Sequence, residues 1–341
     1  MRLIQIVALA LLLQLGNFAA QADSPLTRLL EAELARLPTK SGIYIKHLGS
    51  GEEASVRADD EFESASTIKL ATMVLAYQLA DQNKLDLNER HVIKQADYRG
   101  GSGIFKHHDP GMNPTLRDVI TQMVITSDNT ATDIMIAKVG GKDRVNRFLR
   151  DSGYKVLRQN NTTLEFFRMR FAALDPRYQD LKPEDVFALM NDVPLFVEPR
   201  RALIAEIKQR SADPAAARRM STAWDRKENW FGWATPREMG RLLEGIERGT
   251  IASKRSCDEM KRIMLAQQAG ELKLRHYLTV PVAHKTGETG TVTNDVGMIY
   301  ARSGTILISF FNMDLSGPRA ETEDGMGRAA RLVVDYFDGE R

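Results

Sequence analysis

The sequence predicts an α+β fold in which an antiparallel sheet is flanked by N- and C-terminal helices and carries an all-helical lobe. Strand-like runs occur near both ends of the chain, and the long stretch between them has helical patterns. We therefore expect one domain over residues 23–341. Its sheet part comes from about 23–62 and 280–341, and its helical lobe from about 63–279, with an expanded segment at about 165–234.

The first segment is typical of a secretory signal. It has Arg2, an apolar run over residues 3–15, and a small-residue cleavage site at Ala20-Gln21-Ala22. The apolar run is shorter than the roughly 20 residues that span a bilayer. We expect residues 1–22 to be removed, leaving a periplasmic or secreted protein that starts at Asp23 and does not insert into a membrane.

The first elements after this segment are a helix and a hairpin. Ser24-Pro25 is typical of a helix start, and apolar residues spaced along one face continue to Pro38. Two strand-like runs, 43–48 and 54–57, then flank a turn at Gly49-Ser50-Gly51.

The middle of the chain is predicted to be helical. Thr115 with Asp118 resembles a capping box, and Thr235-Pro236 begins another helix. The expected helices cover residues 70–79, 116–125, 134–139, 145–149 and 239–246, with further helical patterns at 185–195 and 201–208. Strand-like runs return at 282–284, 296–301 and 305–311, and a last amphipathic helix at 329–337 is expected to lie against the sheet.

Composition excludes several classes of site. The formal charge is +2, so no large field favours nucleic acid. A single cysteine, Cys257, rules out an internal disulfide and a cysteine-based zinc site. His107-His108-Asp109 lacks further ligands at zinc spacing, and no glycine-rich phosphate loop is present, so we expect neither metal nor cofactor.

The strongest chemical signal is Ser66-Thr67-Ile68-Lys69. A serine hydroxyl becomes a useful nucleophile when a nearby base takes its proton, and Lys69 lies one helical turn beyond Ser66 on the same face. Ser152-Gly153-Tyr154-Lys155 repeats the spacing, but it follows a helix and precedes a helix-ending glycine. Ser66, which opens a long apolar stretch, is the better candidate.

Two further strings follow in order, Ser127-Asp128-Asn129 and Lys285-Thr286-Gly287. Singly, the first also fits a helix cap and the second a strand end. Together with Ser66 and Lys69 they resemble the signature of class A serine β-lactamases and penicillin-binding proteins. The resemblance covers most of the chain and is closest over 63–153 and 282–300.

The resemblance implies roles for these residues. Ser66 would attack the carbonyl of a β-lactam amide, Lys69 would take or direct its proton, and Ser127 would relay a proton to the leaving nitrogen. Asn129 would hold the substrate's side-chain amide, and Lys285 with Thr286 would bind its carboxylate. The backbone N–H groups of Ser66 and Glu288 would form the oxyanion hole, where the Glu288 carboxylate would oppose the developing negative charge unless it points away.

One motif of the family is altered. Members usually carry E-x-x-L-N, whose glutamate activates water, whereas this chain reads Asn161-Thr162-Thr163-Leu164-Glu165. Glu165 is the candidate for that role, and an ordinary loop or helix carboxylate is the alternative. The segment after it is expanded, and its aromatic residues are expected to pack the insert rather than line a cleft: Trp224, Trp230, Phe231 and Trp233.

The sequence, with this resemblance, therefore predicts a periplasmic or secreted serine hydrolase that forms an acyl-enzyme with small-molecule β-lactams and hydrolyses their amide bond, as a β-lactamase does. Two alternatives remain open. One is a peptidase acting on D-alanyl-D-alanine peptides, and the other is a non-enzymatic β-lactam or cell-wall binding protein in which release of the acyl group is impaired.

Overall fold

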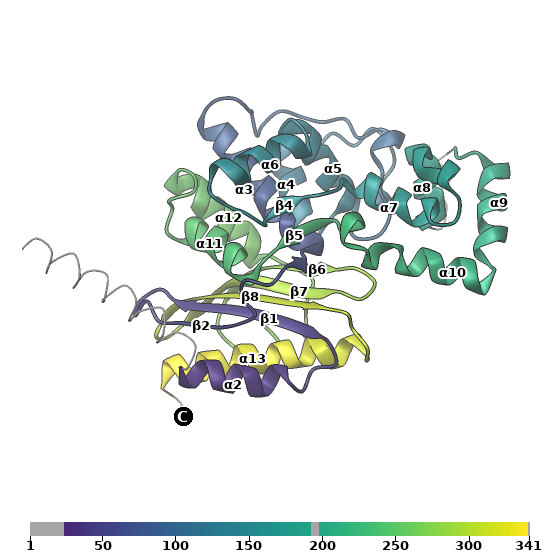
Figure 1. The fold of residues 1–341 in the computed structure, drawn as a ribbon. Helices are drawn as coiled ribbons and strands as arrows, with labels where there is room; N and C mark the ends of the chain where they lie inside the picture. Colours follow the sequence, from purple (N-terminus) through teal and green to yellow (C-terminus); the bar gives the residue numbers. More distant parts are fainter. Residues whose placement is uncertain (1–23, 192–197, 340–341) are drawn as a thin grey trace, which may run out of the picture.

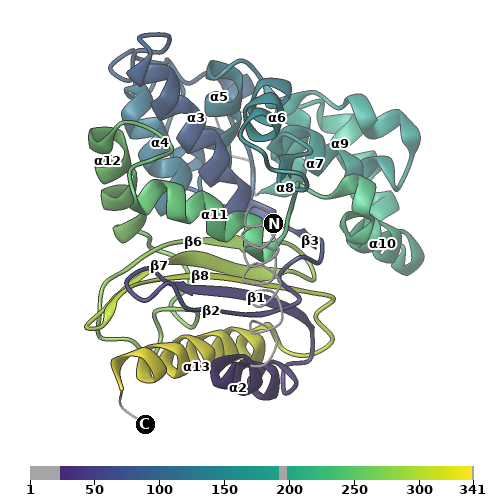
Figure 2. The ribbon, with the colours of Figure 1, turned by 60° about the vertical axis from the view of Figure 1, so that its left-hand side comes forward.

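The computed structural model describes residues 24–191 and 198–339, and it stacks three layers on one another. The two terminal helices form one layer, a five-stranded sheet the next, and a helical lobe the third (Figure 1). The view turned by 60° shows the same order of layers (Figure 2). The predicted signal segment, residues 1–22, lies outside the described residues.

The sheet joins the two ends of the chain. Its strands are β1 (Lys40–His47), β2 (Glu53–Val56), β6 (Val282–Glu288), β7 (Thr293–Ala301) and β8 (Gly304–Met313), in the order β2-β1-β8-β7-β6. All neighbours are antiparallel, and Ile43 of β1 pairs with Phe310 of β8. The predicted α+β class and the β1–β2 hairpin are confirmed. Strand β6, which carries Lys285-Thr286-Gly287, is an edge strand.

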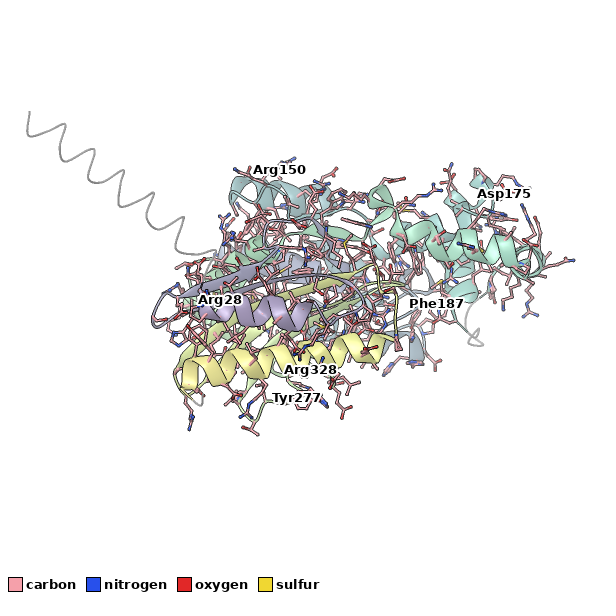
Figure 3. The ribbon with its side chains drawn as sticks, turned by 60° about the horizontal axis from the view of Figure 1, so that its bottom comes forward. Arg28, Arg150, Asp175, Phe187, Tyr277 and Arg328 are labelled. Carbon is pink, nitrogen blue, oxygen red and sulfur yellow. The ribbon has the colours of Figure 1, made fainter. Side chains whose placement is uncertain are left out.

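Helices α2 (Pro25–Leu34) and α13 (Arg319–Asp338) cover one face of the sheet. The predicted start of α2 is confirmed, because the Ser24 side chain accepts a hydrogen bond from Thr27 N at 3.1 Å. An ion pair joins the two helices, with Arg328 Nε 2.7 Å from Glu33 Oε1. Figure 3 views this layer, with Arg28 on α2 and Arg328 on α13.

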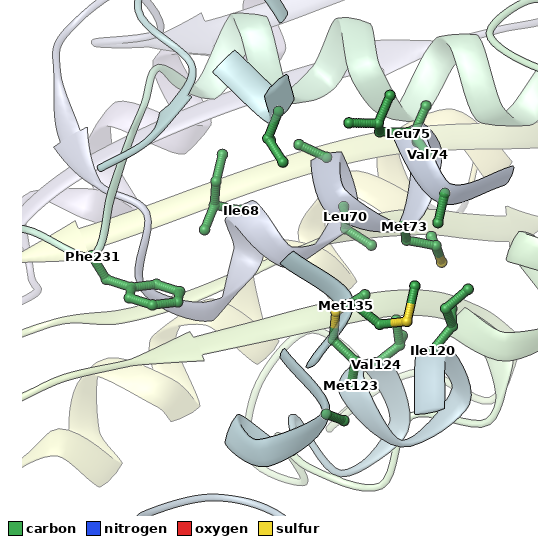
Figure 4. Packing of buried hydrophobic residues seen from close by; sticks show 14 of the residues in the cluster. Ile68, Leu70, Met73, Val74, Leu75, Ile120, Met123, Val124, Met135 and Phe231 are labelled. Atoms are coloured by element: carbon green, nitrogen blue, oxygen red, sulfur yellow. The ribbon is translucent and has the colours of Figure 1, made fainter. Parts of the chain in front are cut away.

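The lobe is built around α3 (Lys69–Asp81), which is buried on nearly every side. Figure 4 shows its apolar side chains beside those of α4 (Leu116–Ile125) and α5 (Asn129–Lys138). The Thr115–Asp118 capping box and the Thr235 cap are confirmed. The remaining lobe helices are α6 (Lys142–Asp151), α11 (Pro236–Glu247) and α12 (Lys254–Leu265). Helix α12 was not predicted from the sequence.

A second, small sheet was also missed. Its strands are β3 (Phe62–Glu63), β5 (Gly232–Ala234) and β4 (Arg158–Gln159), in the order β3-β5-β4. Strands of two or three residues are too short to show an alternating pattern. This sheet ties β3, shortly before Ser66, to β5 at the end of the expanded segment and to β4, which precedes that segment.

The expanded segment projects from the lobe (Figure 1). It contains α7 (Thr163–Ala172), α8 (Pro183–Met190), α9 (Arg201–Ser211) and α10 (Pro214–Ser221). The helix predicted at 185–195 is therefore α8, which is described as far as Met190, and part of the predicted range lies outside the described residues. The helix predicted at 201–208 is α9.

Candidate active site

Ser66 lies in a tight 3₁₀ turn, η1 (Ala65–Ile68), between β3 and α3. Ala65, just before it, has a φ of +44°, a left-handed conformation that is costly for a residue with a Cβ. Strand β6 passes close by: a Cβ built on Gly287 would lie 2.8 Å from Ser64 O and 3.0 Å from Ser66 N. Only glycine fits there, and the close approach holds strand β6 against Ser66 N at the residue before Glu288.

Lys69 is fully buried at the start of α3. Its Nζ donates hydrogen bonds to Ser127 O at 2.7 Å, Asn129 Oδ1 at 2.9 Å and Ser127 Oγ at 3.2 Å. Burial lowers the pKa of Lys69 to about 7, against a smaller opposing effect of Asp128 and Asp133. A substantial fraction of Lys69 is therefore a neutral amine near pH 7, and a neutral amine can accept a proton.

Ser127 joins the two buried lysines. Lys285 Nζ donates to Ser127 Oγ at 2.9 Å, and also to Thr286 O at 2.7 Å. Burial, with Lys69 as a neighbouring cation, holds the pKa of Lys285 well below its usual value. Ser127 itself has a φ of +55°, a second left-handed residue at this site.

Asp128 and Asn129 hold a loop over this cluster. The Asp128 carboxylate accepts from Ala131 N at 2.8 Å, which caps α5, and from Phe105 N at 2.8 Å. Asn129 donates through Nδ2 to Gly100 O at 2.9 Å. Loop 100–105 is therefore fixed beside Ser127, and the helix-cap alternative for this string coexists with its place in the cluster.

Glu288 is paired with a lysine that the sequence analysis did not single out. Lys273 is fully buried, and its Nζ lies 2.5 Å from Glu288 Oε1 and 3.5 Å from Glu323 Oε1. The Lys273 cation lowers the pKa of Glu288, against burial, which raises it. The negative charge expected to oppose an oxyanion is therefore offset by this ion pair. Thr286 is buried, and its methyl group would lie 2.6 Å from a Cβ built on Gly270.

A cavity of about 250 Å³ opens beside Ser66. Among its lining residues are Ser66, Asn129, Glu288, Phe166, Arg170, Trp224 and Phe231. Trp224 and Phe231 pack against the core of the lobe, as expected, and they also line this cavity, whereas Trp230 and Trp233 pack against each other at 4.8 Å. A larger hollow of about 1210 Å³ beside α2 and β2 contains none of the predicted site residues, so the smaller cavity is the candidate site.

Glu165 lies in the first turn of α7, and its carboxylate is already engaged. Its Oε2 accepts from Thr162 N at 2.8 Å in a capping box and lies 2.8 Å from Lys142 Nζ. Burial raises its pKa, but these hydrogen bonds and the Lys142 cation outweigh it and lower the pKa overall. Glu165 does not line the cavity, and neither do the buried Lys69, Ser127 and Lys285, so the feature that sets Glu165 apart is its engagement with Thr162 and Lys142. Asn161 is buried and donates to Trp230 O at 2.8 Å.

Two further residues at the site were missed from the sequence. Glu63 is 1% exposed and accepts from Phe231 N at 3.2 Å and Thr289 Oγ1 at 3.0 Å. Burial raises the pKa of Glu63 to about 7. The sequence feature that could have identified Glu63 is its position three residues before Ser66. Arg170 lines the cavity, with its guanidinium 5.2 Å from the centroid of the Trp224 ring. No motif in the sequence distinguishes Arg170 from the other basic residues of the expanded segment.

The histidines make other contacts. His284 Nδ1 lies 2.9 Å from Asp295 Oδ1 inside the sheet, and His108 Nδ1 lies 3.1 Å from Ile104 O. Within residues 24–191 and 198–339, no three His, Cys, Asp or Glu side chains are grouped so as to hold a metal ion. Across the same residues, each helix is too short or too polar to cross a bilayer.

A model of the β-lactamase enzyme family matches residues 25–337 of the chain. The chain is 30% identical to β-lactamase L2 of Stenotrophomonas maltophilia over 166 residues, 48% of this chain and 54% of that protein. That match spans about half the length of the relative. A second relative, β-lactamase VEB-1 of Pseudomonas aeruginosa, is 22% identical over 347 residues, 98% of this chain and 97% of that one.

The fold has solved counterparts. The TLA-3 extended-spectrum β-lactamase superimposes with a TM-score of 0.70 at 20% identity, over 91% of this chain and 98% of that one. At this identity the likeness concerns the fold, and it agrees with the predicted class.

Proposed function

The chain belongs to the β-lactamase enzyme family, and from the geometry of its site we propose that it is a serine hydrolase that forms an acyl-enzyme on Ser66 and hydrolyses β-lactam amides. One observation carries the proposal. Two buried lysines converge on Ser127 Oγ, with Lys69 Nζ at 3.2 Å and Lys285 Nζ at 2.9 Å, and Asn129, which accepts from Lys69 Nζ, lines the same cavity as Ser66. Such a chain of groups can move a proton between a nucleophile and a leaving group.

In the acylation step, neutral Lys69 accepts the proton of the Ser66 hydroxyl. The bond from Ser66 Oγ to the carbonyl carbon forms, the carbon–nitrogen bond of the lactam breaks, and a proton passes through Ser127 to the leaving nitrogen. The N–H groups of Ser66 and Glu288 stabilise the oxyanion, a contribution worth on the order of 3 kcal/mol for each donor. Water then adds to the acyl carbon and releases Ser66.

We assign the orientation of the substrate to Asn129 and Lys285. Asn129 lines the cavity and is assigned the substrate's side-chain amide. Lys285 is assigned the attraction of its carboxylate. Thr286, whose methyl group lies beneath Gly270, is a weaker candidate for direct contact with that carboxylate, and we assign it support of strand β6.

The group that activates water is not Glu165 in this proposal, because that carboxylate is tied to Thr162 N and Lys142. We assign the activation of water to Lys69, which is neutral again once its proton has passed to the leaving nitrogen. The position of the family's glutamate is taken by Asn161, whose amide is bound to Trp230 O. This observation favours a second candidate, a penicillin-binding-like peptidase that is acylated by β-lactams, releases them slowly, and acts on D-alanyl peptides.

Location is part of the proposal. The composition of residues 1–22 supports export to the periplasm. The mass of the protein recovered from a periplasmic extract tests it, with a chain starting at Asp23 as the expected product and the full chain in the cytoplasm as the contrary result.

Intact-mass spectrometry over time with benzylpenicillin tests the function. We expect an adduct on the wild type that decays as the lactam is hydrolysed, and no adduct on Ser66→Ala. Ser152→Ala, in the second S-x-x-K, is the control and should behave as the wild type. A stable adduct together with D-alanine release from a D-alanyl-D-alanine peptide would favour the second candidate. No adduct on the folded wild type would exclude both.

A further inference from the structure

Arg170 brings an unpaired cation to the wall of the cavity. Its Nε is buried and has no hydrogen-bond partner, and within the described part of the chain no carboxylate forms an ion pair with its guanidinium. Burial lowers the pKa of Arg170, with no acidic neighbour to oppose that effect. The side chain as a whole is partly buried, and its buried Nε keeps an unmade hydrogen bond that a ligand in the cavity can accept.

Neighbouring arginines differ from Arg170 in this respect. Arg168, on the same helix, donates to Leu181 O at 2.8 Å, and Arg99 lies 2.7 Å from Asp133 Oδ2. Farther along the insert, Arg210 lies 2.8 Å from Asp175 Oδ2. Each of these guanidiniums therefore forms a hydrogen bond or an ion pair within the fold, whereas the described contact of Arg170 is with the face of the Trp224 ring.

The wall around Arg170 is aromatic and held in place. Trp224 stacks on Phe166 with ring centroids 4.6 Å apart, and its Nε1 donates to Phe166 O at 2.8 Å. Phe231 packs edge-on against Phe166 at 5.7 Å. A planar ring can stack on such a surface with little loss of side-chain freedom, because these side chains are already fixed.

The same cavity contains Ser66 and Asn129. Its volume of about 250 Å³ is below the range of roughly 300–1,000 Å³ for a complete ligand pocket, so it suits one side chain of a substrate whose reacting amide lies at Ser66. That side chain would meet aromatic rings and a guanidinium.

We propose that Arg170, Trp224 and Phe166 form a specificity subsite for an acyl side chain that combines an aromatic ring with a carboxylate. The ring stacks on the Trp224–Phe166 pair, and the carboxylate accepts hydrogen bonds from the Arg170 guanidinium, a geometry for which the planar fork of arginine is suited. The inference rests on the proposed acylation of Ser66 by an amide substrate.

Two penicillins that differ by one group test it. Benzylpenicillin has a phenylacetyl side chain, and carbenicillin carries an added carboxylate on the same side chain. We expect Arg170→Gln to lower the kcat/KM ratio of carbenicillin to benzylpenicillin about tenfold, the effect of losing a hydrogen bond between charged groups. Arg170→Lys, which keeps the charge and loses the fork, should lie between the two. Arg218→Gln removes an exposed arginine of the same insert and serves as the matched control.

A second measurement does not depend on turnover. Binding of phenylmalonate and of phenylacetate is followed by the intrinsic tryptophan fluorescence of the protein. The wild type and Arg218→Gln should bind phenylmalonate more tightly, and Arg170→Gln should lose the preference. Equal binding of the two acids by the wild type, or a preference retained in Arg170→Gln, overturns the subsite. Acylation of Ser66 by both penicillins with an unchanged ratio in Arg170→Gln overturns the subsite and leaves the proposed function standing. Absence of acylation by either penicillin overturns the proposed function, and the fluorescence result then decides the subsite alone.

Discussion

Lys285 Nζ donates a hydrogen bond to Ser127 Oγ at 2.9 Å, although 158 residues separate the two in the sequence. The same Oγ lies 3.2 Å from Lys69 Nζ. The Ser127 hydroxyl thus contacts the amines of both Lys69 and Lys285, and the Ser127 backbone has a left-handed conformation. A residue held in such a conformation by its surroundings is typical of a functional site.

Replacement of Ser127 by alanine removes the hydroxyl between the lysines. We expect Ser127→Ala to lower the acylation rate about 100-fold, as for the loss of a proton-transfer group. Lys69 would keep its bonds to Ser127 O and Asn129 Oδ1, so the fold should be retained. Stopped-flow measurement with nitrocefin, alongside circular dichroism, checks this. A rate near that of the wild type would remove Ser127 from the proton path.

The pH dependence of acylation follows from Lys69. Its pKa is lowered to about 7, and only the neutral amine accepts a proton. Acylation by benzylpenicillin should therefore rise with pH, with a midpoint near 7, and fall below it as the amine is protonated. Single-turnover rates between pH 5 and pH 9 measure the midpoint. A flat profile across this range would contradict the role of Lys69 as base.

Gly287 allows strand β6 to pass close to the nucleophile turn. A Cβ at this position would meet Ser64 O at 2.8 Å and Ser66 N at 3.0 Å, so Gly287→Ala should push the strand away from the turn. A displacement of about 1 Å can cost roughly 100-fold in rate. Gly290→Ala is the control, because a Cβ there has no neighbour within 4 Å. Equal acylation rates in the two variants would speak against this close approach.

Glu63 makes stability depend on pH. Burial raises its pKa from 4.5 to about 7, so the folded state binds more protons than the unfolded state between these values. The free energy of unfolding of the wild type should therefore fall as pH rises from 4.5 to about 7, and the stabilising contribution of Glu63 is lost above that pH. Glu63→Gln resembles the neutral acid and should gain about 3 kcal/mol relative to the wild type between pH 5 and pH 8.

Urea unfolding of both proteins at several pH values measures this difference. The titration of Lys69 is common to the two proteins and cancels in the comparison. A difference in unfolding free energy that stays constant with pH would show that Glu63 keeps an ordinary pKa.

Glu165→Ala is expected to affect stability rather than release of the acyl group. The change removes a capping box and the ion pair with Lys142, at a cost of about 1 kcal/mol in the free energy of unfolding. Lys142→Ala removes the ion pair alone and separates the two effects. Decay of the acyl-enzyme, followed by mass spectrometry, should match that of the wild type. A long-lived adduct confined to Glu165→Ala would restore Glu165 as the activator of water.

Local signals in the sequence were enough for much of the architecture. The caps at Ser24, Thr115 and Thr235 and the turn at Gly49-Ser50-Gly51 depend on residues a few positions apart, and the structure has helices and a hairpin where they predict them. Helix α12 has apolar residues at Cys257, Met260, Ile263 and Met264, a helical spacing that was present in the sequence and overlooked.

Burial and partners were decided by the tertiary structure. Glu63 and Glu165 are both glutamates near the site. Glu63 is buried and accepts hydrogen bonds from Phe231 N and Thr289 Oγ1, whereas Glu165 caps helix α7 and pairs with Lys142. Neither difference can be read from neighbouring residues, because the groups that desolvate or pair a carboxylate come from distant parts of the chain.

The order of the motifs, the helix caps and the split placement of the strands are properties of short stretches, and the amino-acid sequence alone specified them. The meeting of Lys69, Ser127 and Lys285, the small β3-β5-β4 sheet and the unpaired Arg170 beside Trp224 exist only once α3, α5, β6 and α7 are packed together. Distance and desolvation act through space, and those quantities are set when the chain is folded.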